Sequence, residues 1–274
     1  MASAHGTVQA PDTEPGLVTP RAGARARDWA EIQERMLVPL YEAVHERLEV
    51  GPATSLLGLG CRSGLALLLA AARGAQVAGV EPREELRELA RARGLRVGAV
   101  GAGPLPAPPT AHALVTVFDP SRLCADPRRT VREAARLTLP GGQVVLAGWG
   151  PPERCESAAV LEVARRRSGP RPAPDPFALS RPGALEELLA TAGLRPAGSG
   201  RVSCPFAYPD LESAVRGLLS TGCYDAAIGY SGEVPVTKEV IEALHPFTHS
   251  DGTVRMTNVF RYLLADRPRR PGPR

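Results

Sequence analysis

A regular alternation of strands and helices between residues 55 and 149 constrains the fold of this chain more than any other feature. Strands are predicted from short apolar runs at 55–59, 75–82, 96–100, 113–118 and 143–149. Helices are predicted between them, from amphipathic periodicity, at 65–73, 83–94 and 126–139. Strands that alternate with helices at this spacing form parallel sheets covered on both faces. The sequence therefore predicts a doubly wound, Rossmann-like α/β fold.

The segments on either side of this core predict an additional helix and a cap. An amphipathic helix is expected to begin at Asp28, which has the spacing of a capping box with Glu31, and to kink near Pro39. After residue 150 the pattern changes, and further elements are expected at 154–167 (helix), 182–192 (helix), 194–208 (strand), 210–221 (helix), 235–246 (helix) and 253–265 (strand). We interpret 28–150 as the core with its N-terminal helix, and 151–266 as the last strands with a helical cap.

The composition of the chain limits which binding partners and which cellular compartment are expected. The net charge is +4, and residues 267–274 contain four Arg and no acid, so this predicted disordered basic tail accounts for the excess and nucleic acid is not an expected partner. Residues 1–27 lack the apolar region of a signal peptide and are predicted to be a disordered leader. No apolar stretch is long enough for a membrane span. Five scattered cysteines without a C-x-x-C pair indicate a reduced, cytoplasmic protein.

The glycine-rich turn "LLGLGCRSG", residues 56–64, is the main candidate for a cofactor site. It follows a predicted strand and precedes a predicted helix, an arrangement that directs backbone N–H groups and the positive end of a helix dipole at one point. Glu81 lies 17 residues after Gly64, at the end of the second strand. A carboxylate at that place can accept hydrogen bonds from both hydroxyls of a ribose.

Together with the later "LPGGQVVLAGW", these motifs make residues 28–266 resemble the class I S-adenosylmethionine-dependent methyltransferases, in particular the small-molecule group with a ubiquinone-type methyltransferase domain. The resemblance implies a mostly parallel, seven-stranded sheet with an antiparallel edge strand, a helical cap, and a small organic acceptor, as in specialised metabolism. It implies S-adenosylmethionine as the cofactor. The cofactor-binding positions that it implies are Gly58, Gly60, Cys61, Gly64, Glu81, Pro82, Ala99 and Phe118.

Three positions of the chain depart from the family pattern. Gly58 stands where the family has an acid, Arg62 replaces the middle glycine, and Ala99 replaces the acid that bonds the adenine amine. Each lost bond to a charged group is worth roughly 1.5–3 kcal/mol, so two losses weaken binding by ~10²–10⁴-fold. Arg62 either pairs with the cofactor carboxylate or fills the methionine pocket. The alternative is that such loops vary and that backbone contacts suffice.

Candidates for chemistry and for substrate contact follow from their places beside the predicted pocket. Asp119 and His245 are expected to move protons, and Arg62 to stabilise a developing oxyanion. Substrate contacts are expected from Tyr41, Trp149, Tyr208, Tyr224 and Tyr230. For each histidine and aromatic residue a purely structural role is the alternative. The "FDPS" at 118–121 resembles a motif of amino-group methyltransferases, but a turn explains it as well. Pro246 interrupts the spacing of His245 and His249, and no metal site is predicted.

Three functions remain open at this point. The first is a methyltransferase, monomeric or homodimeric, that acts on a small molecule. The second is an enzyme of the same fold that has lost methyl transfer and catalyses a cyclisation, an isomerisation or a hydrolysis. The third is a non-catalytic binding protein.

Overall fold

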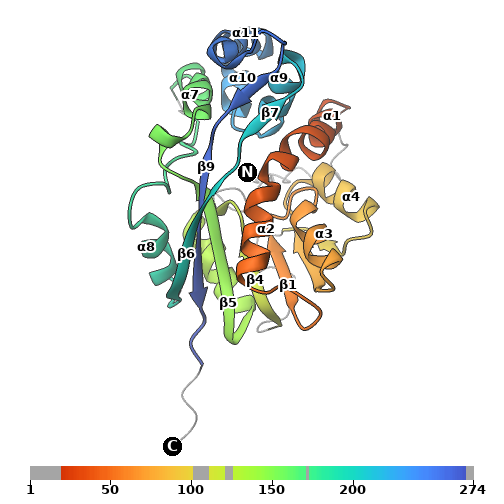
Figure 1. Ribbon diagram of the computed structural model, residues 1–274, viewed down its shortest axis with the longest axis vertical. Helices are drawn as coiled ribbons and strands as arrows, with labels where there is room; N and C mark the ends of the chain where they lie inside the picture. The colour runs from red at the N-terminus through yellow and green to blue at the C-terminus, as the bar shows by residue number, and fades with distance from the viewer. Residues whose placement is uncertain (1–19, 101–110, 121–125, 171–172, 270–274) are drawn as a thin grey trace, which may run out of the picture.

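A seven-stranded sheet forms the centre of the computed structural model, which describes residues 20–100, 111–120, 126–170 and 173–269 (Figure 1). The strand order is β3-β2-β1-β4-β5-β9-β6. The strands are β1 Ser55–Leu59, β2 Gln76–Val80, β3 Val97–Gly98, β4 His112–Val117, β5 Thr138–Trp149, β6 Arg195–Ser203 and β9 Val259–Asp266. All neighbours from β3 to β5 pair in parallel, whereas β9 is antiparallel to both β5 and β6. The predicted doubly wound fold is confirmed, with its antiparallel strand one place in from the edge strand β6.

Helices cover both faces of the sheet because the strands present apolar side chains on each. In β5, Val145 and Ala147 belong to one buried cluster, while Val144 and Leu146 belong to another. The first cluster includes residues of α2 (Val38–Arg47), α3 (Leu65–Ala72) and α4 (Glu84–Ala92). The second includes residues of α6 (Pro127–Leu137) and α8 (Ala184–Ala190). Side chains that alternate along a strand therefore produce the three layers.

A cap lies above the carboxyl ends of the parallel strands (Figure 1). Its elements are α7 Ser157–Arg167, α9 Leu211–Ser220, α10 Asp225–Ser231, α11 Glu233–Leu244 and the two-stranded sheet of β7 Phe206–Tyr208 and β8 Val254–Met256. The single strands predicted at 194–208 and 253–265 are thus wrong, since each divides between the main sheet and the cap. Pro205 explains the first division, because it has no N–H to donate to a ladder.

The N-terminal helix is longer and less regular than predicted. It comprises α1 (Pro20–Asp28), a π-helical turn (Trp29–Gln33) and a 3₁₀ turn (Glu34–Leu37) before α2. Pro39 lies in the first turn of α2, where its missing N–H costs nothing. The predicted leader therefore ends too late: α1 begins at residue 20, and Ala26 is buried beside Trp29 and Leu86. Residues 1–19 of that leader lie outside the described residues.

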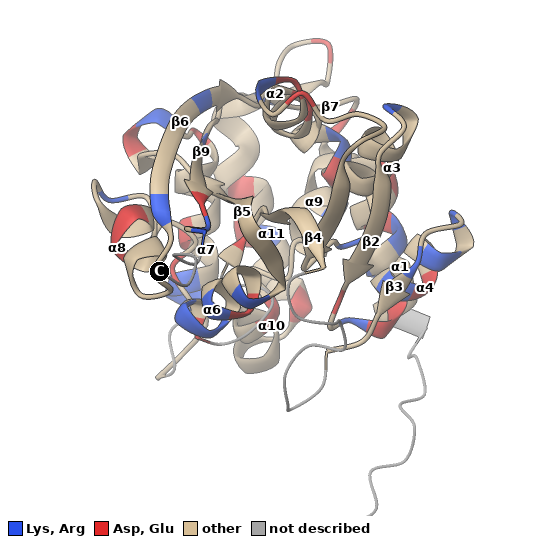
Figure 2. Ribbon diagram, turned by 90° about the horizontal axis from the view of Figure 1, so that it is seen from below, with Lys and Arg blue, Asp and Glu red and all other residues tan. Residues whose placement is uncertain are grey.

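Charges of both signs are interspersed over the outer helices α4, α6 and α8 (Figure 2). The first residues of the predicted basic tail contact the core, since the Arg267 guanidinium donates to the backbone oxygen of Arg136 at 3.2 Å. Residues 270–274 lie outside the described part. Within the described ranges, no helix combines the length and the apolar character that a bilayer crossing requires.

Candidate functional site

The turn after β1 has the backbone of a glycine loop, with one residue that does not suit it. Gly60, Arg62 and Gly64 all have positive φ, at 67°, 55° and 87°. That conformation is free for glycine but costs roughly 1–2 kcal/mol for another residue. Two contacts offset the cost at Arg62: its backbone N–H donates to Glu81 Oε2 at 2.8 Å, and its guanidinium carbon lies 4.4 Å from the ring centroid of Trp29.

Gly58 and Cys61 pack together as core residues beneath this turn. A Cβ atom at Gly58 would lie 3.1 Å from Leu67 Cδ2 and 3.2 Å from Cys61 Cβ, so the place of the expected acid is already filled. Gly79 on β2 is needed for the same reason, since its Cβ would lie 2.6 Å from Cys61 Sγ. Burial raises the pKa of the Cys61 thiol well above its usual range, and the nearby charge of Glu81 adds to this. Cys61 is therefore a neutral, apolar filler.

Glu81 stabilises the turn itself. It is 2% exposed, and its two carboxylate oxygens accept the backbone N–H groups of Arg62 at 2.8 Å and Arg83 at 3.1 Å. A polar pocket of about 360 Å³ lies beside it, lined by Arg62, Glu81, Arg83, Gly222 and Asp225. The carboxylate predicted to bind a ribose is thus part of the local hydrogen-bond network of the loop.

A separate cavity of about 380 Å³ lies under the cap, next to the carboxyl ends of β1 and β4. The strand order reverses between these two strands, and ligands of doubly wound sheets bind at such a point. Its aromatic lining consists of Trp29, Tyr41, Phe118, Trp149, Phe206 and Phe260. Its polar lining includes Gln33, Arg62, Thr116, Asp119, Thr221 and Cys223. This volume and this mainly apolar lining suit a small organic ligand.

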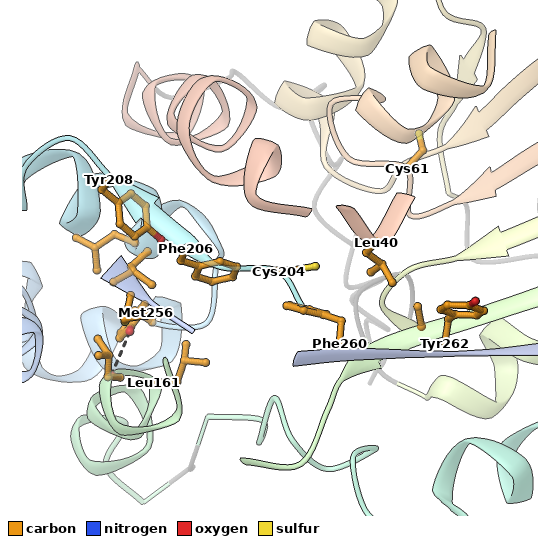
Figure 3. Packing of buried hydrophobic residues seen from close by; sticks show 14 of the residues in the cluster. Leu40, Cys61, Leu161, Cys204, Phe206, Tyr208, Met256, Phe260 and Tyr262 are labelled. Carbon is orange, nitrogen blue, oxygen red and sulfur yellow. Dashed lines mark hydrogen bonds between the residues drawn. The ribbon is translucent and has the colours of Figure 1, made fainter. Parts of the chain in front are cut away.

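The aromatic lining is held by contacts between the core and the cap. The ring centroid of Trp149, at the end of β5, lies 4.5 Å from that of Phe260 and 5.7 Å from that of Phe206. Figure 3 shows Phe206 and Phe260 between the cap residue Tyr208 on one side and the core residue Leu40 on the other. The two rings stand where the strands β6–β7 and β8–β9 pass from the sheet to the cap, so the split strands place them at the cavity.

The structure brings several of the predicted site residues to this cavity. They are Tyr41, Gly58, Gly60, Cys61, Arg62, Phe118, Asp119 and Trp149. Gly64 instead begins α3, and a side chain there would overlap Leu95. Pro82 and Ala99 line no part of the cavity among the described residues; the Pro82 carbonyl accepts from Arg87 at 3.3 Å, and Ala99 is exposed.

Four predicted residues are placed elsewhere, each for a physical reason. His245 is exposed in the turn that follows α11, away from the cavity lining. Tyr208 and Tyr224 are buried core residues of the cap whose hydroxyls donate to Gln33 Oε1 at 2.8 Å and to the Val160 carbonyl at 3.1 Å. Tyr230 is 66% exposed. Within the described residues, no group of three or more His, Cys, Asp or Glu side chains could hold a metal ion.

Two polar residues of the N-terminal segment, one amide and one acid, were not predicted from the sequence to belong to the site. Gln33 lines the cavity, and Glu34 is buried beneath the turn, where it accepts a hydrogen bond from the Ser63 hydroxyl and lies 3.9 Å from Arg93. Burial raises the pKa of Glu34 to about 7, against the lowering effects of Ser63 and Arg93. Gln33 was detectable, because it lies four residues after Trp29 on the apolar face of the predicted helix.

These residues do not fit S-adenosylmethionine in the way that the resemblance implies. The expected acids are absent at 58 and 99, and Arg62 lines both the polar pocket and the cavity. Arg62, stacked on Trp29, is shared by the linings of the two pockets.

Comparisons with known proteins agree with the fold. Residues 57–146 match the family model of a methyltransferase domain. The YcgJ protein from Bacillus subtilis is 17% identical over 84% of this chain and 98% of its own, with a TM-score of 0.56. The [4+2]-cyclase SpnF is 20% identical (84% and 81%, TM-score 0.54), and a geranyl diphosphate C-methyltransferase from Streptomyces coelicolor is 18% identical (89% and 83%, TM-score 0.50). No curated protein has a significant sequence match to the chain.

Proposed function

We propose that this chain, whose residues 57–146 match a methyltransferase domain, binds a small, mainly apolar organic molecule in the capped cavity and acts on it without S-adenosylmethionine. The cap helices of residues 151–266 and the N-terminal segment enclose the substrate in this proposal. In this proposal the methyltransferase fold supports a different reaction, since one fold commonly hosts many unrelated functions.

The observation that carries the proposal is the position of Arg62. Its guanidinium stacks on Trp29, and the residue borders both the polar pocket beside Glu81 and the aromatic cavity. A methyl donor bound through Glu81 has to present its sulfonium to an acceptor in the cavity. Arg62 borders both of these places, so in this proposal its side chain competes for the space of the cofactor and its positive charge opposes the positive sulfonium.

The cavity offers groups for proton transfer without a cofactor. Asp119 follows β4 and lines the cavity as a candidate base, and Arg62 is a candidate partner for a developing oxyanion. A proton-transfer isomerisation needs only that a proton be removed from one atom of the substrate and returned to another. We propose Asp119 for that transfer and Arg62 for the negative charge that forms between the two steps.

Methyl transfer from S-adenosylmethionine is the second candidate, and one observation favours it. The turn keeps positive φ at Gly60 and Gly64, and Glu81 remains next to it at the end of β2. In this version Arg62 leaves Trp29 when the cofactor binds, and the backbone of the turn holds the cofactor without the two acids.

Calorimetric titration with S-adenosylmethionine decides between the two. We expect no binding to the wild-type protein at millimolar cofactor, and micromolar binding would contradict the proposal. In the Arg62→Gly variant we expect weak binding to become measurable, because the barrier is removed while the acids at 58 and 99 are still missing. That variant should fold normally, since glycine suits the φ of 55° and offsets the lost contact with Trp29.

Arg83→Ala is the matched control for that titration. It removes a second arginine from the polar pocket but leaves Arg62 on Trp29. If loss of positive charge alone restored binding, both variants would gain it. If only the Arg62→Gly variant gained cofactor binding, the position of Arg62 would be the reason that the wild-type protein does not bind S-adenosylmethionine.

A further inference from the structure

Tyr41 is a polar residue at the cavity whose hydroxyl has no hydrogen-bond partner among the described residues. It lies on α2, is 3% exposed and lines the cavity, with its ring centroid 4.7 Å from that of Phe118. No hydrogen bond joins its hydroxyl to any residue that the structure describes. The hydroxyl oxygen is not fully enclosed by the atoms around it. The hydroxyl therefore opens onto the cavity.

Gln33 provides a second group of this kind. It is 2% exposed and also lines the cavity. Its Oε1 accepts from the Tyr208 hydroxyl at 2.8 Å, which leaves the amide N–H₂ as the end that can donate. In the described part of the chain the amide nitrogen has no hydrogen-bond partner and is not fully enclosed. Two buried side chains of the N-terminal segment thus keep unused donors beside an aromatic cavity.

The hydroxyl of Tyr41 is a donor under physiological conditions. Burial raises the pKa of Tyr41 well above its ordinary value, and the charge of Glu34 raises it further, against the lowering effect of Arg62. Tyr41 therefore keeps its proton. A protonated phenol that faces a ligand pairs best with an atom that only accepts. A buried donor left unpaired costs roughly 1–3 kcal/mol, so a ligand that supplies the acceptor binds more tightly than one that does not.

We propose that the cavity binds an apolar molecule carrying a carbonyl oxygen, and that the Tyr41 hydroxyl donates a hydrogen bond to that oxygen. This inference rests on the proposed function, because it assigns the chemical class of the ligand of the same cavity. The aromatic walls contact the hydrocarbon part, and Tyr41 positions the carbonyl. Gln33 lies on the same segment as a second donor for a ligand with two such oxygens.

A pair of probes of equal shape tests this inference. Cyclohexyl phenyl ketone carries the carbonyl, and in its hydrocarbon isostere a methylene carbon replaces the oxygen. Both tryptophans of the chain line the cavity, so their fluorescence reports binding of either probe. In the Tyr41→Phe variant we expect the Kd of the ketone to rise about 3- to 10-fold, whereas that of the hydrocarbon should stay the same or fall, because the unpaired donor is gone.

Each outcome of this experiment has one meaning. If both probes bind and Tyr41→Phe leaves the Kd of the ketone unchanged, or weakens both probes equally, the role of Tyr41 is overturned while the cavity remains a binding site. If neither probe binds the wild-type protein, the proposed function is overturned as well. Tyr230→Phe is the control, since it removes a hydroxyl from an exposed tyrosine outside the cavity. Tyr41→Phe should unfold at the same urea concentration as wild type, because the hydroxyl has no partner to lose.

Discussion

The two pockets on either side of Arg62 differ in chemistry although one side chain borders both. The polar pocket is lined by Glu81, Arg83 and Asp225 together with Arg62, while the cavity is lined mainly by aromatic rings. Here a cation stacked on Trp29 divides them.

This difference shows that a protein can keep the backbone of a cofactor loop while the side chains in and beside that loop have other roles. Gly60 and Gly64 preserve the turn, yet Glu81 holds the loop, Cys61 fills the space of the missing acid, and Arg62 separates the pockets. Substitutions on the polar side, beneath the turn and on the cavity side test this division.

The largest effect is expected on the polar side, from Glu81→Ala. The buried carboxylate accepts two backbone N–H groups, and bonds to a charged group are worth roughly 1.5–3 kcal/mol each. We expect the free energy of unfolding in urea to fall by about 4 kcal/mol. Glu88→Ala, an exposed carboxylate on α4, is the control and should change it by no more than about 0.5 kcal/mol. Equal stability of the two variants would mean that Glu81 is reserved for a ligand.

Beneath the turn, Glu34→Gln is expected to change how stability depends on pH. The pKa of Glu34 is about 7 in the folded protein and 4.5 ordinarily, so its stabilising contribution is complete below about pH 4.5 and is lost as pH rises through 7. Glutamine stays neutral and can still accept from Ser63. Relative to wild type, the free energy of unfolding of this variant should rise by about 3 kcal/mol between pH 4.5 and 8. Parallel stability curves of the two proteins would show that Glu34 does not titrate in this range.

His45 gives the opposite sign and serves as the contrast for that measurement. It lies on α2, fully buried, with no hydrogen-bond partner for either ring nitrogen in the described residues. Burial lowers its pKa from 6.5 to about 4, with the charge of Arg73 adding to this. The stabilising contribution of His45 to the free energy of unfolding is therefore complete above pH 6.5, and it is lost as pH falls through 4. Between pH 4.5 and 6.5, Glu34 lowers the free energy of unfolding as pH rises, whereas His45 raises it. The difference in this free energy between Glu34→Gln and wild type isolates Glu34, because both proteins contain His45.

The fold could be predicted because its signals are local. Alternating apolar residues in β5 and the glycines of the turn need only a few neighbours to be interpreted, and both predictions match the structure. Pro205 was also visible, but its effect was underestimated: it divides one long strand into two and so carries Phe206 into the cap. The aromatic lining of the cavity depends on that division.

The site was harder to predict because its contacts join distant segments. Tyr208 and Tyr224 suggested a ligand surface by their proximity in sequence, yet Gln33 and Val160 satisfy their hydroxyls within the core of the cap. Glu34 reaches Ser63 across 29 residues, and no local pattern connects the two. Burial, which depends on the whole fold, decides which polar groups are structural and which face the cavity.

On the cavity side, Gly58→Asp is expected to have the smallest effect of the three, because it restores the missing acid where neighbours can give way only slightly. Its Cβ would lie 3.1 Å from Leu67 Cδ2 and 3.2 Å from Cys61 Cβ, and overpacking of this kind costs roughly 1–3 kcal/mol. We expect a loss of about 2 kcal/mol in the free energy of unfolding. In a Cys61→Gly background, which lacks the Cys61 contact, Gly58→Asp should cost less than it does in the wild-type protein. If Gly58→Asp alone were as stable as wild type, the space for the acid would still exist, and the absence of a side chain at 58 would not be caused by packing.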